Sequence, residues 1–169
     1  RGNLDIAAVD LSNTHSIISS KGDLRILASQ NIVNDTGLVL HQGTGNALIQ
    51  ASGALSNAAG QIEGQGQTLT VSAGDIDNSA GQIVQTSTRD PLTAPSTLNI
   101  IATAGGINTG ELRNIKGDIS GTGNISVTVA KLLTDASSAS LSSGGSLSFL
   151  DKSKVGSGAS TASSTYNWE

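Results

Sequence analysis

Aliphatic residues recur along the chain in short alternating runs, and one eight-residue phrase organises them. The phrase occurs as Leu55-Ser-Asn57-Ala-Ala-Gly60-Gln-Ile62 and, 21 residues later, as Ile76-Asp-Asn78-Ser-Ala-Gly81-Gln-Ile83. Its general form, aliphatic-x-Asn-x-x-Gly-x-Ile, places hydrophobic positions on both sides of a turn. A period near 20 residues is typical of a solenoid, in which one repeat cannot bury its apolar face alone.

Weaker copies of the phrase surround Asn13, Asn34 and Asn114. In the first of these Ser16 stands where glycine is expected, and we expect the serine to be tolerated if that turn avoids positive φ. The glycines of the other copies are expected to permit the bend into the next face of the solenoid; they are Gly37, Gly60, Gly81 and Gly117. The asparagines are expected to form a structural column, bonded to one another or to the turn backbone.

Alternating apolar positions precede each copy, as a half-buried strand requires. Leu4 and Ile6 open the first layer and Leu24 and Ile26 the second, while Leu48 is expected to open the third and Leu69 the fourth. No helical period is present. The pattern predicts an all-β fold: a parallel β-helix with about 20–23 residues per coil over residues 1–129.

Two insertions interrupt the repeat, because Asn114 follows Asn78 by 36 residues. The first lies near 86–96 and contains both prolines, which predicts a loop leaving the solenoid. It carries Arg89 and Asp90, and because loops on rigid scaffolds often hold function, these two residues are the candidate recognition site. The second insertion, 104–110, is glycine-rich. Residues 130–153 are expected to form terminal β coils or a cap, and 154–169 a Ser/Gly-rich boundary segment.

Composition narrows the function classes. Charged residues make up 13% of the chain, where an ordinary domain has roughly 25%, and this suits thin layers with small polar turns. A net charge of -4 does not indicate the basic surface that nucleic-acid binding requires. No apolar run is long enough to predict a membrane span. Cysteine is absent, which is compatible with an extracellular solenoid that needs no disulfide.

Candidate chemistry is sparse. Stacking the repeats aligns Asp77 with Ser56 and Asp5 with Arg25, and no two carboxylates share a column in adjacent well-registered layers. We therefore predict no catalytic acid pair and no calcium cage. His15 and His41, the only histidines, are expected at the surface or in loops, without a metal or a cofactor.

The repeats resemble those of filamentous haemagglutinin and the contact-dependent inhibition exoproteins of the two-partner secretion family. The likeness rests on Leu48, Leu55, Asn57, Gly60 and Ile62, and on Leu69, Val71, Ile76, Asn78, Gly81 and Ile83. It implies a right-handed β-helix that an outer-membrane partner transporter exports and that is displayed as a surface rod.

Such a rod presents adhesive elements to a receptor or glycan on target cells and is not an enzyme. Two alternatives remain open at this stage. One is a carbohydrate-active β-helix of the lyase or tailspike type, and the other is a pure spacer without a ligand.

Overall fold

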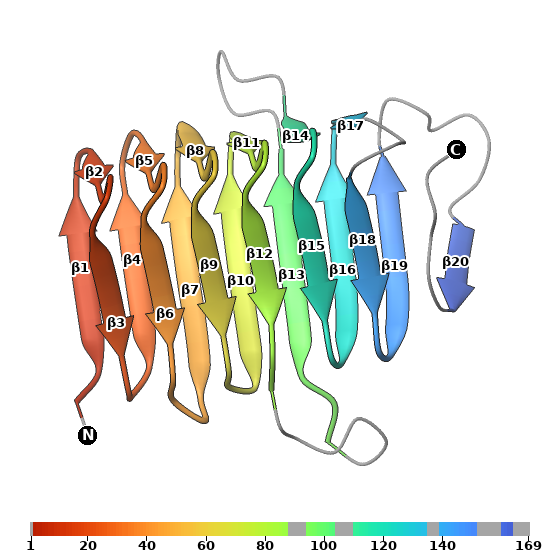
Figure 1. Ribbon diagram of the computed structural model, residues 1–169, viewed down its shortest axis with the longest axis horizontal. Helices are drawn as coiled ribbons and strands as arrows, with labels where there is room; N and C mark the ends of the chain where they lie inside the picture. The colour runs from red at the N-terminus through yellow and green to blue at the C-terminus, as the bar shows by residue number, and fades with distance from the viewer. Residues whose placement is uncertain (1, 88–93, 104–109, 135–138, 152–159, 164–169) are drawn as a thin grey trace.

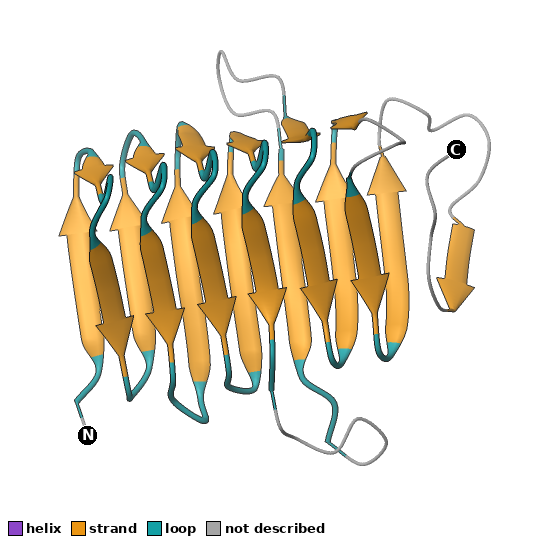
Figure 2. Ribbon diagram, viewed as in Figure 1, coloured by secondary structure: helices purple, strands orange, loops and turns teal. Residues whose placement is uncertain are grey.

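The computed structural model describes residues 2–87, 94–103, 110–134, 139–151 and 160–163. Within these ranges the chain forms β-strands and the turns between them, and no helix (Figure 2). The strands wind into stacked coils, and each complete coil contributes one strand to each of three sheets (Figure 1). The predicted all-β parallel β-helix is therefore confirmed.

The three sheets run along the length of the solenoid. The first contains β1 (Leu4–Ala8), β4 (Leu24–Ala28), β7 (Asn46–Ala51), β10 (Thr68–Ala73), β13 (Thr97–Ala102), β16 (Asn124–Val129), β19 (Ser146–Asp151) and β20 (Ser160–Ser163). The second contains β2 (Leu11–Ser12), β5 (Ile32–Val33), β8 (Ala54–Ser56), β11 (Asp75–Asp77), β14 (Glu111–Asn114) and β17 (Lys131–Thr134). The third contains β3 (Ile17–Ser20), β6 (Leu38–His41), β9 (Gln61–Gly64), β12 (Gln82–Gln85), β15 (Asp118–Gly121) and β18 (Ser140–Ser143).

We number the coils 1 to 6 by their first strands, β1, β4, β7, β10, β13 and β16. Leu4, Leu24, Ala47 and Leu69 occupy one column, so the first three steps advance 20, 23 and 22 residues. Leu98 follows in the same column and Ile125 after it. The stack therefore keeps its register through the longer fourth and fifth steps.

Aliphatic columns fill the narrow interior. One contains Ile26, Ile49, Val71, Ile100 and Val127, and each of these side chains is at most 1% exposed. Parallel columns run through the second sheet, where Leu55 and Ile76 pair, and the third, where Ile62 and Ile83 pair. Burying each such side chain stabilises the fold by roughly 1.5–3 kcal/mol. Alternate residues face water, which explains the period-2 pattern of the sequence.

The expected position of Leu48 is wrong. Ala47 lies in the core column at 1% exposure, while Leu48 points outward beside Arg25 and Thr70. The reason is turn length: three residues separate Ala51 from Leu55, whereas two separate Ala73 from Ile76. Counting back from Asn57 by the spacing of the fourth coil therefore misses the register by one residue, which reverses the face.

Both insertions lie between strands. β13 pairs with β10 through Leu98 and Leu69, and β14 pairs with β11 through Leu112 and Ile76. The additional residues therefore leave the stacking of the fifth coil on the fourth intact. One insertion precedes β13 in the chain and the other follows it, so they are attached at opposite ends of this strand.

Beyond coil 6, β19 continues the first sheet, and β20 then pairs with it in the antiparallel direction through Leu147 and Ala162. Within 154–169, which the sequence predicts as a boundary segment, the structure thus has one short strand. The rest of that segment lies outside the described residues.

Candidate functional site

The most regular polar feature of the solenoid is a column of buried asparagine side chains. In this Asn ladder, the Nδ2 of each of the first four asparagines donates to the Oδ1 of the asparagine in the next coil, at 2.7, 2.7, 2.8 and 2.8 Å in order. Its members are Asn13, Asn34, Asn57, Asn78 and Asn114. The ladder crosses both insertions, because Asn78 and Asn114 are 36 residues apart in the chain.

Each amide also binds the turn backbone. Asn57 Nδ2 donates to the Gly60 carbonyl at 3.3 Å and to the Gln82 carbonyl of the next coil at 3.1 Å. Asn34, Asn57 and Asn78 are 0% exposed, so none of these amides is accessible to a ligand. The geometry assigns the ladder a structural role.

The phrase glycines are required by close packing rather than by backbone dihedral angles. A Cβ on Gly60 would lie 2.1 Å from the Asn34 carbonyl oxygen, and one on Gly81 the same distance from that of Asn57. None of the four phrase glycines has positive φ; the preceding residue has it instead, with φ of 52° at Ala59 and 53° at Ala80. These glycines therefore permit the turn because they have no side chain, while their backbone conformation is available to any residue.

The same turn explains Ser16. His15 has φ of 53°, so coil 1 has the same turn conformation as the others. Ser16 itself does not have positive φ, which is the condition under which a serine is tolerated there. Among the described residues, no coil lies beneath coil 1. The Ser16 Cβ therefore meets no asparagine carbonyl of a coil beneath, whereas a Cβ at the same position in coils 2 to 5 would. The Ser16 hydroxyl donates to the Thr14 carbonyl of its own turn at 3.2 Å.

Asp and Asn residues at the corners form a second set of bonds between coils, which sequence reasoning missed. The side-chain oxygen of one coil accepts the backbone N–H of the next: Asp10 from Asn31, Asn31 from Ala54, and Asp75 from Glu111, at 2.8–3.0 Å. The spacing of 21 residues between Asp10 and Asn31 was the available signal.

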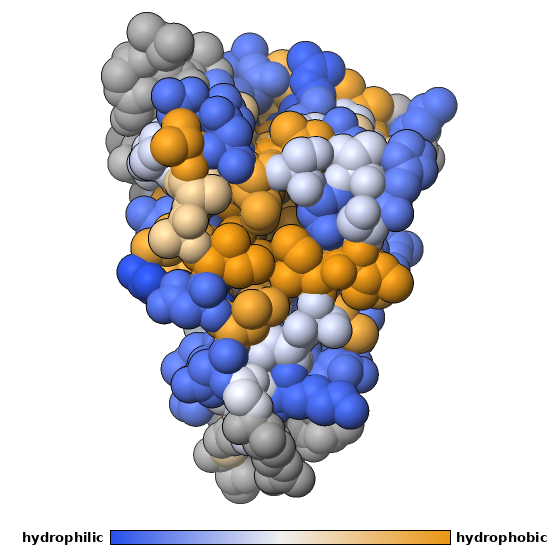
Figure 3. Space-filling model, turned by 90° about the vertical axis from the view of Figure 1, so that its left-hand side faces the viewer, coloured by the Kyte–Doolittle hydropathy of each residue, from blue (hydrophilic) through white to orange (hydrophobic). Residues whose placement is uncertain are grey.

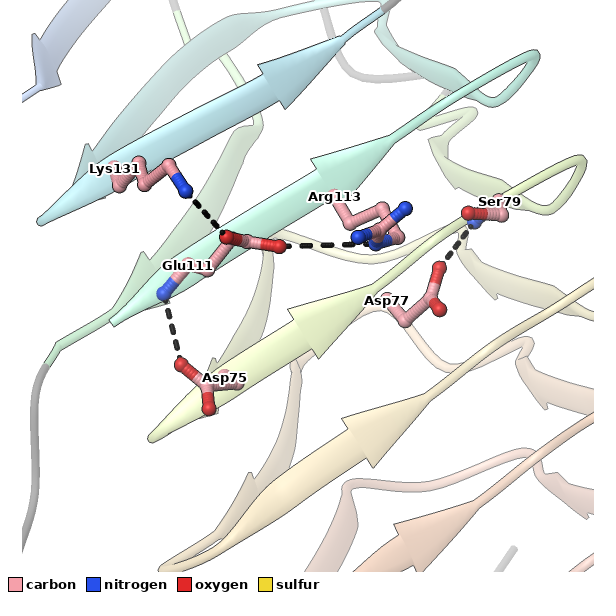
Figure 4. Close-up of polar contacts among 6 residues, drawn as sticks. All are labelled: Asp75, Asp77, Ser79, Glu111, Arg113 and Lys131. Atoms are coloured by element: carbon pink, nitrogen blue, oxygen red, sulfur yellow. Dashed lines mark hydrogen bonds and ion pairs between the residues drawn. The ribbon is translucent and has the colours of Figure 1, made fainter. Parts of the chain in front are cut away.

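A charged patch covers the outer face of the second sheet over coils 4 to 6 (Figure 4). Glu111 lies at its centre, with Oε2 3.1 Å from Lys131 Nζ and Oε1 3.7 Å from Arg113 Nε. Asp77, which pairs with Ser56 as predicted, accepts the Ser79 N–H at 2.9 Å. Asp75, Asp77, Glu111 and Arg113 border a shallow hollow of about 220 Å³.

Two carboxylates do share a column in this patch, although the aligned repeats of the sequence contain no such pair. Ile76 pairs with Leu112, so Asp75 and Glu111 occupy adjacent coils at the same position. Their alignment is hidden in the sequence because two insertions separate them. Both carboxylates already bind within the fold, Asp75 to a backbone N–H and Glu111 to two cations.

The two histidines differ in environment. His15 is exposed, as expected, but His41 is 0% exposed at the end of β6, and its predicted surface position is wrong. Neither ring nitrogen of His41 makes a hydrogen bond of acceptable geometry. Desolvation by burial lowers the pKa of His41, and the nearby Gly22 carbonyl and Asp23 carboxylate oppose this shift more weakly.

The candidate recognition residues Arg89 and Asp90 lie outside the described residues. The chain on both sides of their segment is anchored. Ser87 and Ser96 are 4% and 2% exposed, the Thr122 hydroxyl donates to the Ser87 carbonyl at 2.9 Å, and Thr86 Oγ1 bonds Glu63 Oε1 at 2.8 Å. The segment 88–93 therefore begins and ends at fixed points of the stack.

In the part of the chain that the structure describes, no three metal-ligating side chains of the His, Cys, Asp and Glu types come together. The same part contains no helix long and apolar enough to cross a membrane. No protein-family model, no curated protein and no solved structure matches this chain.

Proposed function

We propose that this chain is a non-enzymatic rod segment of a large bacterial exoprotein, secreted and displayed at the cell surface, that presents binding elements to target cells. The family resemblance of the repeats makes it an adhesin or the stalk of a contact-dependent inhibition toxin. Its partners are then an outer-membrane two-partner secretion transporter and a receptor or glycan on the target cell.

One observation carries the proposal: the stack holds its register on both sides of the 86–96 insertion. Gln85, the last residue before it, pairs with Gly64 and Gly121, and Thr97, the first strand residue after it, pairs with Thr68 and Asn124. A scaffold with repeated hydrogen bonds that carries a loop at fixed points suits presentation, because binding residues are commonly placed on loops of rigid scaffolds.

Replacing residues 88–93 with a Gly/Ser segment of equal length tests the adhesive role. We expect binding of the purified chain to bacterial or cultured epithelial cells to fall at least about tenfold, which corresponds to about 1.4 kcal/mol, while its melting temperature stays unchanged. Arg89→Ala with Asp90→Ala should reproduce most of the loss. Arg113→Gln, which removes a charge from the patch on the second sheet, is the matched control and should bind normally.

Equal cell binding by the parent chain and the loop replacement would support the pure spacer instead. Export is tested separately, by surface labelling of the full-length gene product in cells with and without a two-partner secretion transporter. Surface signal that persists without the transporter would contradict the proposed secretion route.

A further inference from the structure

The first coil leaves one end of the solenoid open. Figure 3 views this end and shows apolar side chains gathered across its centre. Leu4, Ile6, Leu11 and Ile18 are only partly buried there, although their counterparts in coil 2, Leu24, Ile26, Ile32 and Val39, are at most 2% exposed. Val9 at 58% and Ile17 at 69% are the exposed large hydrophobic residues of the described chain, and both belong to coil 1.

The backbone of this end is an open strand edge. β1, β2 and β3 each pair with a strand of coil 2 on one side and with no described strand on the other. Unpaired edges of this kind bind further strands. An apolar centre with three open edges fits another coil of polypeptide better than a small molecule.

The Asn ladder has a direction, which leaves a free acceptor at the same end. Each Nδ2 donates toward higher residue numbers, so Asn13 Nδ2 reaches Asn34 Oδ1 and the Leu38 carbonyl. Asn13 is 3% exposed, and no described residue donates to its Oδ1. An occupant that supplies an N–H or a hydroxyl here would complete the ladder at this end, as the preceding asparagine does for each later member.

Ser16 excludes one class of occupant. In coils 2 to 5, the position of Ser16 is glycine, because a Cβ would lie 2.1–2.2 Å from the asparagine carbonyl of the coil beneath. Since His15 and the Ser16 N–H to Asn13 carbonyl bond of 3.2 Å give coil 1 the same turn, the Ser16 Cβ points to the same place. A preceding coil with the Asn turn of coils 1 to 5, which places an asparagine carbonyl there, would collide with it.

The other end of the ladder shows how a different kind of coil stacks. In coil 6 the register partner of Asn114 is Thr134, whose hydroxyl donates to the Asn114 carbonyl at 3.4 Å. Six residues lead from Thr134 to Ser140, where four lead from Asn114 to Asp118. The connection between the second and third sheets is therefore two residues longer where the ladder ends, and β17 and β18 still pair with the strands of coil 5.

We propose that the open end of coil 1 is a docking surface for a β-coil that lacks the Asn turn shared by coils 1 to 5, so that the Asn ladder is a unit of five coils bounded at both ends. The occupant adds strands to β1, β2 and β3, covers Ile17, and supplies a donor to Asn13 Oδ1. This inference concerns assembly of the rod and does not depend on its adhesive role.

Two fusions to the full chain test the proposal, with hydrogen exchange of the Leu4–Ala8 amides as the readout. The first repeats residues 4–22 ahead of Asn3 and so adds a coil with the Asn turn. The second places a copy of residues 124–145 ahead of Asn3 and adds a coil without it. Each is made with Ser16 and with Ser16→Gly in the original coil, and the unfused Ser16→Gly chain is the control.

We expect the coil without the Asn turn to slow exchange in β1 at least about tenfold in both backgrounds. The coil with the Asn turn should do so only with Ser16→Gly. Equal protection of β1 by the Asn-turn coil in the Ser16 chain would overturn the proposed selectivity. Absence of protection in all four fusions would overturn the docking surface itself.

Discussion

Each asparagine of the ladder serves two structures at once, because its amide closes its own turn and bonds to the next coil. For Asn57 these bonds reach Gly60, Asn78 and Gln82, and it also accepts from Asn34. The Asn57 side chain is 0% exposed, and an unsatisfied donor or acceptor in such a position costs about 1–3 kcal/mol. The single side chain therefore couples local conformation to stacking.

Asn57→Asp tests this coupling with almost no change in volume. The carboxylate cannot donate to Asn78 Oδ1 or to the Gln82 carbonyl, and it buries a charge among oxygen atoms. We expect a loss of at least about 3 kcal/mol in the free energy of unfolding, measured by urea denaturation. The control is Ser12→Asp, which changes the exposed residue directly before Asn13. It should lower the free energy of unfolding by less than about 0.5 kcal/mol.

The phrase glycines give a second prediction. Gly60→Ala places a methyl group 2.1 Å from the Asn34 carbonyl oxygen, and the backbone there is fixed by neighbouring coils. Overpacking of this kind costs typically about 1–3 kcal/mol or more, and we expect a matching fall in melting temperature. Gly2→Ala, with no atom within 4 Å of the added Cβ, is the control. Equal melting temperatures of the two variants would refute the close-packing explanation.

Because His41 is buried, we expect the free energy of unfolding to depend on pH. Burial lowers the pKa of its side chain, so the unfolded chain binds a proton more readily than the folded one. The contribution of neutral His41 to stability is therefore complete above the ordinary histidine pKa of 6.5 and is lost as pH falls below that value. Unfolding free energy should decrease from pH 7 to pH 5, and His41→Gln should reduce this slope. An unchanged slope in that variant would assign the effect to other groups.

At the scale of elements, the strands are stabilised by the columns in which they stack. Ile100 is 0% exposed between coils 4 and 6, whereas Ile6 begins the same column at the open end and is partly buried. Ile100→Ala should cost about 2–5 kcal/mol in unfolding free energy, and Ile6→Ala less than half as much. Denaturant unfolding of both variants checks this, and equal losses would contradict an open first coil.

The strands could be predicted from the sequence because an alternating pattern and a recurring turn report the same register. The outward position of Leu48 could not be predicted, because one additional turn residue reverses the face of a strand. The eight-residue phrase does not include that turn residue. His41 and the Asp75–Glu111 pair escaped it because their environments are set by coils far apart in the chain. The reason for the glycines also required the neighbouring coil, whose carbonyl occupies the space of a side chain.

At the scale of the whole molecule, the chain is a short rod whose interactions are almost all between adjacent coils. Backbone ladders repeat at each interface between coils 1 to 6, and the Asn ladder repeats from coil 1 to coil 5, so stability is expected to be close to a sum over coils. The two insertions add residues without changing this sum, because β13 and β14 pair with β10 and β11 directly. Such an architecture accepts loops as surface elements while the rod stays continuous.

Distances between spin labels test the central claim, that residues about one coil apart in sequence lie directly above one another. The chain has no cysteine, so pairs can be placed freely. Asp5, Asn99 and Ser126 share one outward column, in coils 1, 5 and 6. At about 4.8 Å per coil, Asp5→Cys with Asn99→Cys should give a backbone separation of about 19 Å, and Asp5→Cys with Ser126→Cys about 24 Å. Narrow distributions that increase by one strand spacing between the two pairs are the predicted result. Broad distributions, or separations that do not follow the number of coils, would contradict the stacked solenoid.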